Sequence, residues 1–368
     1  MAAANSPAST ASLGQHGRAG MEMLGAAQKA AASLLRSVAK ARFETSEVGA
    51  RLTREGGMRG SPQKIQADLQ DAVASASADP VYRLERFHQR YVAEQIYDRG
   101  IIAVEERRER FATATAPELA NLDLAGQDGG PAYHGAVEWH LRPGGWDGYD
   151  LYPAVGAHAL APLVFRLGGY AAVPVGENIR QQRRDVIAQL PKARYDRIFE
   201  PGCGGVPTLS ALAERFPEAE LVGCDLSPSM LRGGAVLAQK LGLNVTLKRR
   251  DALRSGEPDA SFDAVVTYAL HHELPPEDNV ALLREMFRIL KPGGDILMSD
   301  PPPFRAVDPF AAVLLDWETQ NREEPFFSQA ALTDWTQVLS DIGFENAEAY
   351  ALAAGGYPWV TRARKPTG

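Results

Sequence analysis

Cysteine is scarce in this sequence, which contains only Cys203 and Cys224 among its 368 residues. Two thiols are too few for a disulfide framework or a zinc site. We therefore expect both cysteines to be reduced and the protein to be cytoplasmic. The sequence also lacks the charged-then-apolar order of a signal peptide. Its Ala- and Ser-rich start is typical of a transit peptide or, more simply, of a disordered tail.

Long apolar runs and an excess of positive charge are absent as well. No run approaches the roughly 20 apolar residues that a membrane-spanning helix needs. The formal net charge of −7 argues against a nucleic-acid-binding protein, whose binding domain would be basic. The apolar content of 45% is that of a soluble globular protein, and the length accommodates about two domains. We therefore expect neither a membrane span nor a nucleic-acid partner.

The first part of the chain is predicted to be mainly helical. Residues 1–20 are rich in Ala, Ser and Gly and have little to bury, so we expect them to be mobile. Apolar residues at helical spacing predict a helix over 21–51, and Ser61 followed by Pro62 is a typical start of a second helix. A third helix is expected over 79–112, where charged runs such as "VEERRER" indicate a solvated face.

A stretch dense in aromatic residues and glycine follows, "YHGAVEWHLRPGGWDGYDLYP". Pro143 and the glycines beside it prevent a long helix here. The aromatic side chains either pack into a buried loop or line a pocket for a flat or apolar substrate. In and after this stretch lie His134, His140 and His158, which are either packed or, for one of them, a base above such a pocket.

From Tyr195 onward, short β-rich runs alternate with helical segments. The β-rich runs are "RIFEPG", "ELVGCD", "VTLKRRD", "FDAVVTYA" and "GGDILMSD". Strands that alternate with helices indicate a parallel sheet with helices on both faces, an α/β fold. Two closing strands are expected in "FENAEAYALAAGGYPWVTRARK", joined at a pair of glycines.

The segment "FEPGCGGVPTL" joins the first of these strands to a helix. Gly202 and Gly204 allow a sharp turn and the close approach of a ligand. A dinucleotide fingerprint would need a glycine where this chain has Pro207, a residue well suited to the first turn of a helix. A Walker loop is also excluded, because no Gly-Lys-Ser/Thr follows.

Acidic residues at successive strand ends indicate the kind of ligand. Glu200 would repel a pyrophosphate and attract a cation. Asp225, at the end of the next strand, can accept hydrogen bonds from a ribose diol. Asp251, at the end of the third strand, can reach toward an adenine together with the backbone N–H of Ala252. We therefore predict a nucleoside ligand that carries a positive charge.

At these residues, the chain from about Tyr195 to Asp300 resembles the class I S-adenosylmethionine-dependent methyltransferases, particularly the small-molecule group related to ubiquinone and menaquinone methyltransferases. The resemblance rests on five motifs in the same order: "FEPGCGG", "CDLSPSML", "RRDA", "FDAVVTYALHHEL" and "MFRILKPGGDILMSD". It implies a Rossmann-like sheet of seven strands and S-adenosyl-L-methionine as the cofactor. Val206 departs from the pattern, because the family often has a third glycine there, and this would tighten or reshape the loop.

The resemblance also implies a set of cofactor contacts. Glu200 would lie near the methionine amino group, and Gly202 and Gly204 would lie against its backbone. Asp225 would hold the ribose hydroxyls. The residues beside the adenine, at its edge and at the opening of the fourth strand are Leu226, Asp251, Ala252 and Tyr268.

The catalytic residues are less constrained. A general base is needed only if the acceptor loses a proton, as a hydroxyl does. His271 and His272 follow the fourth strand at the ligand-binding end of the sheet and are candidates, although a histidine pair is often structural in this family. "YDLY" resembles a tyrosine-containing lid, which makes Tyr149 and Tyr152, together with Trp146, candidate substrate contacts.

We therefore predict an S-adenosylmethionine-dependent methyltransferase for a small organic acceptor, with oxygen as the first choice of methylated atom and carbon or nitrogen open. The expected parts are a partly disordered, helical tail (1–75), a helical cap or dimerisation region (76–190) and a methyltransferase domain (191–368). No metal site is expected, and the N-terminal helices are candidates for a homodimer contact. Two alternatives stay open: an enzyme that uses the same cofactor for a cyclisation or decarboxylation, and a non-catalytic nucleoside-binding protein.

Overall fold

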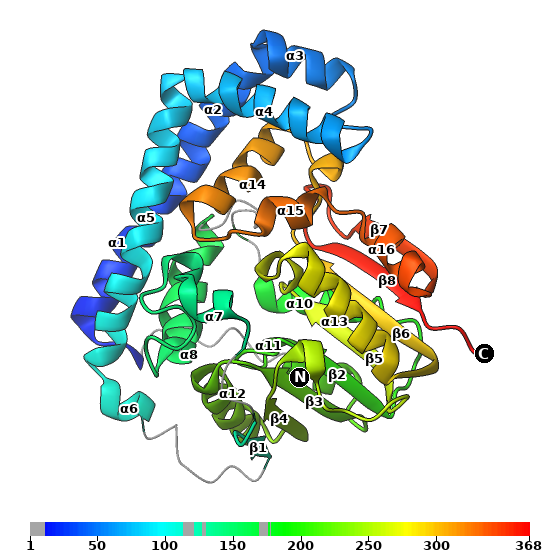
Figure 1. The fold of residues 1–368 in the computed structure, drawn as a ribbon. Coiled ribbons are helices and arrows are strands. Elements are labelled where there is room, and N and C mark those ends of the chain that lie inside the picture. The colour runs from blue at the N-terminus through cyan, green and yellow to red at the C-terminus, as the bar shows by residue number, and fades with distance from the viewer. Residues whose placement is uncertain (1–11, 113–120, 127–129, 169–175, 177) are drawn as a thin grey trace. The chain divides into compact units, whose positions relative to one another are not determined.

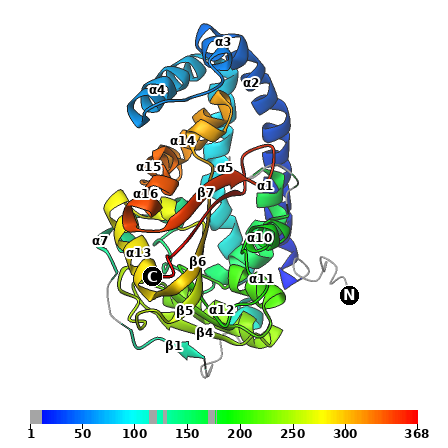
Figure 2. The same ribbon diagram turned by 90° about the vertical axis from the view of Figure 1, so that its right-hand side faces the viewer.

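The computed structural model describes residues 12–112, 121–126, 130–168, 176 and 178–368 (Figures 1 and 2). Contacts between residues divide the chain into two compact units. The first takes in 1–116, 137–177 and 304–324, and the second takes in 117–136, 178–303 and 325–368. The three-part division at 75/76 and 190/191 stays a prediction. Among the described residues, no helix is long and apolar enough to cross a membrane.

The first unit is built from helices. Ser61 caps α4 by accepting a hydrogen bond from the backbone N–H of Lys64 at 3.3 Å, with Pro62 in the first turn, as predicted. Asp79 caps α5, and its Oδ1 accepts from the N–H of Val81 at 2.7 Å. The helices and helical turns are α1 (Gln15–Ala30), η2 (Ala31–Leu35), α2 (Arg36–Thr45), α3 (Glu47–Arg54), α4 (Pro62–Ala78), α5 (Pro80–Glu105), α6 (Arg108–Ala112), η4 (Trp139–Leu141), α8 (Tyr152–Ala154), η5 (Val155–Leu160), α9 (Ala161–Leu163), η6 (Phe165–Leu167), η9 (Phe304–Ala306) and α14 (Pro309–Asn321).

Helix α1 begins at Gln15, earlier than the apolar pattern predicts. Its first turn packs closely against α5, because a Cβ on Gly17 would lie 2.3 Å from the Cα of Ala103. Further along, the side chain of Gln28 donates to that of Gln89 at 3.0 Å, so the two helices run antiparallel. The prediction of a mobile segment is therefore wrong for residues 15–20. Close packing of two helices at a glycine needs no apolar side chain, so the sequence carries no apolar pattern there. Residues 1–11 lie outside the described part of the chain.

The second unit contains a mixed sheet, with eight strands in the described part of the chain, ordered β1-β4-β3-β2-β5-β6-β8-β7. Strand β8 runs antiparallel to β6 and β7, and the other pairs are parallel. The seven predicted strands are present, and β1 is an addition. It was missed because two residues that pair with the edge of β4 carry no periodic pattern. The strands are β1 (Leu122–Asp123), β2 (Arg197–Pro201), β3 (Glu220–Asp225), β4 (Val245–Arg249), β5 (Phe262–Tyr268), β6 (Leu290–Asp300), β7 (Glu345–Ala351) and β8 (Trp359–Arg364).

Both faces of this sheet carry a buried apolar core. Ile198 of β2 packs in one cluster with Leu209, whereas the next residue, Phe199, packs in the other cluster with Leu282. Because successive strand residues face opposite sides, helices must cover both faces, which confirms the predicted fold class. The helices and helical turns of this unit are α7 (Ala132–Ala136), α10 (Ile179–Ile187), α11 (Pro207–Arg215), α12 (Pro228–Leu241), η7 (Ala252–Arg254), η8 (His271–Glu273), α13 (Pro276–Ile289), α15 (Phe327–Leu332) and α16 (Trp335–Ile342).

The strand order reverses direction at β2, which pairs with β3 on one side and with β5 on the other (Figure 1). In open α/β sheets, ligands bind outside the carboxyl ends of the strands at such a reversal. The loops that follow β2, β3 and β5 are therefore the place to look for a ligand site.

Candidate functional site

The loop after β2 adopts the left-handed backbone that its glycines allow. Gly202 has a φ of +64°, and a Cβ there would lie 2.7 Å from Cδ1 of Leu270, so glycine is needed both for conformation and for space. Gly204 has a φ of +49°, and its N–H donates to Oδ2 of Asp225 at 2.8 Å. This bond ties the loop after β2 to the end of β3.

Val206 takes a left-handed conformation that a β-branched residue rarely adopts, with a φ of +61° just before α11. Such a conformation costs about 1–3 kcal/mol. The side chain is fully buried, which is worth about 1.5–3 kcal/mol, so the burial offsets the strain. The departure from the usual glycine therefore keeps the turn and adds an apolar side chain beneath it. A Cβ on the neighbouring Gly234 would lie 2.9 Å from Cγ1 of Val206.

Glu200, on β2, is buried with one carboxylate oxygen unused. Its side chain is 2% exposed, and Oε2 has no hydrogen-bond partner among the described residues. Burial raises the pKa of Glu200 to about 8, while the Thr208 hydroxyl and the Arg183 guanidinium act in the opposite direction. Burying a carboxylate oxygen without a hydrogen bond costs free energy. A cationic ligand that donates a hydrogen bond to this oxygen would remove the cost.

A second set of residues gathers beside Glu200. Tyr268, at the end of β5, has its hydroxyl 3.0 Å from that of Tyr357, which precedes β8. The guanidinium carbon of Arg183 on α10 lies 4.5 Å from the ring centroid of Tyr268, within the range of a cation–π contact. Nε of Arg183 is buried without a hydrogen-bond partner among the described residues. Neither Arg183 nor Tyr357 was predicted from the sequence, since neither residue belongs to a motif.

Asp225 holds the backbone on both sides of the site. Besides the Gly204 N–H, it accepts from the N–H of Ser227, which lies 2.8 Å from Oδ1. The cap of α12 is Ser227, whose hydroxyl accepts from the N–H of Met230 at 3.1 Å. Asp225 therefore lies beside the helix cap and does not itself cap α12. Its position at the end of β3 agrees with the predicted ribose contact, which stays a prediction.

The predicted adenine edge lies after β3 and β4. Leu226 follows β3, and a Cβ on Gly130 would lie 2.6 Å from Cδ1 of Leu226, so the chain at position 130 passes close to this side chain. Oδ1 of Asp251 accepts from the N–H of Leu253 at 2.9 Å and starts the turn that contains Ala252. This bond gives Asp251 a local role in the turn, and its adenine contact stays a prediction.

Tyr133 is a further residue at this edge. Its hydroxyl donates to Oδ2 of Asp278 at 2.7 Å, and its ring meets that of Phe326 edge-on with centroids 5.3 Å apart. Burial is the main cause that raises the pKa of Tyr133, and the charges of Asp278 and Asp251 act in the same direction. The aromatic stretch that begins at Tyr133 pointed to a pocket or a packed loop, but its pattern did not show which strand end it would meet.

His271 is held as a structural residue. It is fully buried, with Nδ1 2.7 Å from Oδ1 of Asn279 and Nε2 2.9 Å from Oγ1 of Thr267. Because the amide oxygen can only accept, Nδ1 donates and Nε2 accepts from the hydroxyl. Burial also lowers the pKa of His271. Both nitrogens of a neutral ring are thus used inside the protein, which favours the structural interpretation.

His272 is arranged differently. Its Nδ1 is paired with Oδ1 of Asp300 at the end of β6, and its Nε2 lies 3.7 Å from Oε1 of Glu273. Oδ2 of Asp300 accepts the backbone N–H of His271 at 2.7 Å, which fixes the carboxylate. The ring of His272 also packs against Phe327, with centroids 5.4 Å apart. A carboxylate that holds one ring nitrogen orients the imidazole, as in histidines that act as bases.

The three candidate substrate residues belong to the first unit. The guanidinium carbon of Arg142 lies 4.0 Å from the ring centroid of Trp146 and 4.9 Å from that of Tyr152. Tyr149 packs edge-on against Tyr152 with centroids 5.4 Å apart, and its hydroxyl donates to Glu105 at 2.8 Å. These contacts show aromatic packing around a cation. The substrate and lid roles of these residues stay predictions.

Comparison with known proteins bears on the second unit. Residues 198–294 match the family described as a methyltransferase domain. This part of the chain is therefore similar to a methyltransferase domain. It contains the glycine loop and the ends of β3, β4 and β5 described above, and the resemblance to class I S-adenosylmethionine-dependent methyltransferases is thereby confirmed.

Two curated relatives and one solved structure illustrate the similarity. The demethylmenaquinone methyltransferase of Thermus thermophilus is 36% identical over 129 residues, which cover 35% of this chain and 57% of the relative. The trans-aconitate 2-methyltransferase of Azoarcus sp. is 34% identical over 118 residues, covering 32% and 44%. Phosphoethanolamine N-methyltransferase 2 of Haemonchus contortus, solved with S-adenosyl-L-methionine, is 18% identical with a TM-score of 0.40, covering 50% of this chain and 52% of that one. The chain spans about half the length of the curated relatives it matches.

Proposed function

We propose that this protein is an S-adenosylmethionine-dependent methyltransferase that acts on a small organic molecule. The observation that carries the proposal is the buried Glu200, whose unused Oε2 lies in the strand that leads into the left-handed glycine loop. An ammonium group is the natural partner for such a carboxylate, and S-adenosylmethionine carries one together with a ribose and an adenine. Asp225 stands at the adjacent strand end, where a ribose diol is expected.

The residues present fit this cofactor. Glu200 would pair with its amino group, and Gly202 and Gly204 leave room for its methionine part. Asp225 would exchange part of its bonding to the loop for the ribose hydroxyls, with Leu226 beside the adenine. The residues proposed near the adenine edge and the methionine end are Asp251, Ala252, Tyr133, Tyr268 and Arg183. When bound, the cofactor supplies a methyl group on a sulfonium, which is open to in-line attack by a nucleophile.

Calorimetric titration of the full-length protein tests this proposal. S-adenosylmethionine and S-adenosylhomocysteine are both expected to bind, and NAD, which lacks the amino acid part and carries a pyrophosphate, is not. Mass spectrometry of candidate acceptors then separates methyl transfer from the alternatives, since a gain of one methyl group is expected on the acceptor. Failure of both sulfur nucleosides to bind would contradict the cofactor assignment itself. Binding without consumption would favour other chemistry or a non-catalytic role.

We favour oxygen as the methylated atom because of the Asp300–His272 pair. A hydroxyl acceptor must lose its proton, and an imidazole oriented by a carboxylate suits that task. The names of the similar proteins cover a demethylated menaquinone, trans-aconitate and phosphoethanolamine, so they do not single out one acceptor for this chain. Buried free thiols at Cys203 and Cys224 are in keeping with the reducing, cytoplasmic location expected from the sequence.

Replacing His272 with asparagine is expected to lower the rate of methyl transfer to hydroxyl acceptors by about 10²–10⁴-fold, because the base is lost. Transfer to amine acceptors should fall much less, since a neutral amine attacks without prior loss of a proton. The measurement is the release of S-adenosylhomocysteine over a panel of phenols and amines. Unchanged cofactor affinity of the variant serves as the control for folding. An equal loss for both acceptor classes would count against the base.

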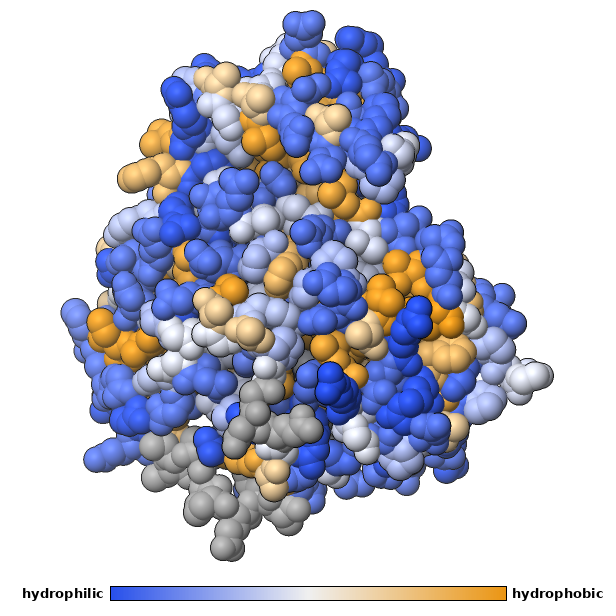
Figure 3. Space-filling view, in the orientation of Figure 1, coloured by the Kyte–Doolittle hydropathy of each residue, from blue (hydrophilic) through white to orange (hydrophobic). Residues whose placement is uncertain are grey.

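We also propose that the first unit forms a homodimer contact. Exposed apolar side chains lie on helices that pack against each other: Leu34 of η2 and Val38 of α2 are 68% and 48% exposed, and Leu84 and Phe87 of α5 are 54% and 72% exposed. The face of the molecule shown in Figure 3 is largely hydrophilic, with separate apolar groups between polar residues. Apolar side chains left in water on neighbouring helices favour burial by another protein surface.

Light scattering after size-exclusion chromatography is expected to give a dimer for the wild type and a monomer for a variant with Phe87→Glu and Leu34→Glu. The physical reason is that two carboxylates would have to be buried in the contact. Leu241→Glu is a matched control, because Leu241 lies on α12 in the second unit and is 51% exposed. A monomeric wild type, or a control that dissociates equally, would contradict this contact.

A further inference from the structure

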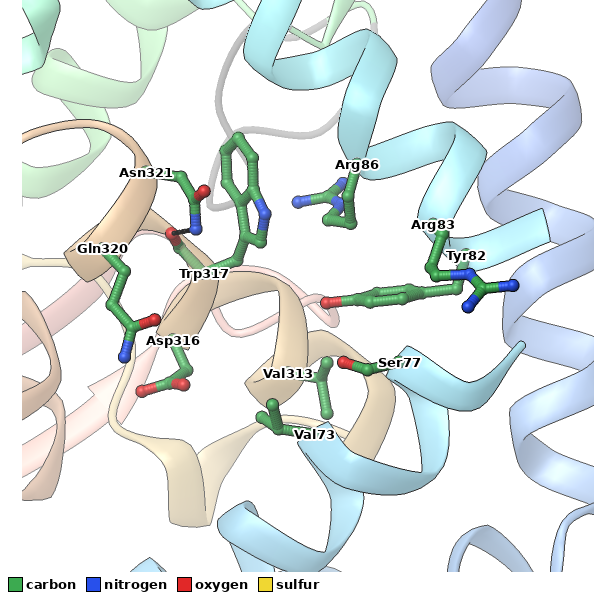
Figure 4. A pocket seen from close by; sticks show the side chains of 10 residues that line it. All are labelled: Val73, Ser77, Tyr82, Arg83, Arg86, Val313, Asp316, Trp317, Gln320 and Asn321. Atoms are coloured by element: carbon green, nitrogen blue, oxygen red, sulfur yellow. Dashed lines mark hydrogen bonds between the residues drawn. The ribbon is translucent and has the colours of Figure 1, made fainter. Parts of the chain in front are cut away.

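The first unit contains a cavity of about 300 Å³ between α4, α5 and α14 (Figure 4). Helix α14 packs against α4, and α4 leads directly into α5 through the capping residue Asp79. The cavity therefore lies among helices of one unit. None of the residues assigned to the cofactor lines it. Its lining residues are Val73, Ser77, Tyr82, Arg83, Arg86, Val313, Asp316, Trp317, Gln320 and Asn321.

Two aromatic rings and a guanidinium form the main wall of the cavity. The guanidinium carbon of Arg86 lies 4.7 Å from the ring centroid of Trp317 and 5.9 Å from that of Tyr82. Figure 4 shows the Trp317 ring and the Arg86 side chain pointing toward each other, with the Tyr82 ring below them. Val73 and Val313 supply an apolar floor. Rings beside an apolar floor suit a ligand with a flat, apolar part.

Arg86 is paired with an acid behind the cavity wall. Arg86 is 5% exposed, and its Nε donates to Oε2 of the fully buried Glu85 at 2.5 Å. The same carboxylate also forms an ion pair with Arg36, whose Nε lies 3.1 Å from Oε1 of Glu85. Among the residues that line the cavity, the charged groups are the guanidinium groups of Arg83 and Arg86 and the carboxylate of Asp316. An anionic group in the cavity would be attracted by the two guanidinium groups of its lining.

The Tyr82 hydroxyl offers the cavity a hydrogen-bond donor. No residue in the described part of the chain forms a hydrogen bond with this hydroxyl, and the hydroxyl oxygen is not among the fully buried atoms that lack a partner. In Figure 4 this hydroxyl points from α5 toward Trp317 and Asp316 across the cavity. The O–H is therefore available to a molecule that enters the cavity.

We propose that this cavity binds a small planar organic acid. The carboxylate of the acid accepts hydrogen bonds from the Tyr82 hydroxyl and from the Arg86 guanidinium, while its flat part lies against Trp317 and the valine floor. The volume is that of roughly ten water molecules, which matches a molecule the size of a single substituted ring. This inference goes beyond the proposed methyl transfer and does not depend on it, because none of the residues involved is assigned to the cofactor.

The test is calorimetry or ligand-detected NMR on the full-length protein, with benzoate as the probe. Benzamide, which has the same shape and no charge, and cyclohexanecarboxylate, which has the charge and no flat ring, are the matched ligands. Benzoate is expected to bind, and each of the other two about tenfold more weakly or worse. Failure of benzoate to bind, or equal binding of benzamide, would overturn the proposal.

Variants locate the binding. Tyr82→Phe keeps the ring and removes only the hydroxyl, and it is expected to weaken benzoate binding by about tenfold. Arg83→Gln should weaken it by less, since this residue is exposed. Arg99→Gln on the same helix is the matched control, because Arg99 does not line the cavity. Thermal unfolding checks that the variants are folded. Unchanged binding in Tyr82→Phe, or an equal loss in the Arg99 control, would place the binding elsewhere and overturn the proposal.

Discussion

Replacing Glu200 with glutamine is expected to weaken S-adenosylmethionine binding by about tenfold to a hundredfold, because the charged partner of the cofactor amino group is lost. Glutamine has nearly the same shape as glutamate and can keep a hydrogen bond to the Thr208 hydroxyl. The variant should therefore fold normally and still bind 5′-methylthioadenosine, which contains the adenosine part without the amino acid. Calorimetry with both ligands checks this result. Equal loss of both ligands would mean that Glu200 acts on the fold and not on the amino group.

The raised pKa of Glu200 predicts a pH dependence of stability. With a pKa of about 8 in the folded protein against 4.5 ordinarily, the folded state binds more protons than the unfolded state between these values. The stabilising contribution of the neutral acid is thus fully present below about pH 4.5 and is lost as the pH rises through 8. Glutamine does not ionise, so Glu200→Gln does not lose this stabilisation at high pH. The free energy of unfolding of the variant should exceed that of the wild type above pH 8, and the two values should lie closer together at pH 6.

Urea unfolding of both proteins at several pH values measures this difference. A second readout is the proton balance of cofactor binding. At pH 6.5 the wild type should release about one proton per S-adenosylmethionine bound, because Glu200 ionises to meet the ammonium, and the variant should release none. Calorimetry in buffers with different ionisation enthalpies detects the release. An unchanged proton balance in Glu200→Gln would show that another group titrates.

Replacing Asp225 with asparagine is expected to weaken every adenosine-containing ligand by about tenfold to a hundredfold, 5′-methylthioadenosine included. Asp225 accepts from two backbone N–H groups, and an asparagine amide would present a donor to one of them. We therefore also expect the free energy of unfolding to fall by about 1–3 kcal/mol. Calorimetry and urea unfolding measure the two effects.

The pair of variants separates the two ends of the site. Glu200→Gln should leave the affinity for 5′-methylthioadenosine unchanged, whereas Asp225→Asn should lower it. The reason is that 5′-methylthioadenosine contains the same ribose as S-adenosylmethionine and S-adenosylhomocysteine. Ser229→Ala, close to the loop after β3 but without a predicted ligand contact, is a matched control for disturbance of the start of α12. A loss of stability in Asp225→Asn without any loss of affinity would assign Asp225 a purely structural part.

Much of the site was predictable because its residues follow strands. The alternation of strands and helices predicted the parallel sheet. Neighbouring parallel strands place Glu200 and Asp225 at the carboxyl ends of the sheet, and this does not depend on how the helices pack. A sharp turn at Gly202 was likewise expected from the sequence, and the structure realises it with a positive φ, which glycine tolerates at little cost. The match to a methyltransferase domain over 198–294 falls on these motifs.

By itself, then, the sequence determined the fold class, the glycine loop and the acids at the strand ends, because these depend on periodicity and on neighbours in the chain. Only the tertiary structure decided what lies beside them. Arg183 meets Tyr268, His272 meets Asp300, and the cavity of the first unit joins α4 and α5 to α14. The tertiary structure also distinguished the environment of His272 from that of the fully buried His271, and it showed that α1 begins at Gln15. Such contacts join residues far apart in the chain, and they are fixed by packing and burial, which leave no local pattern.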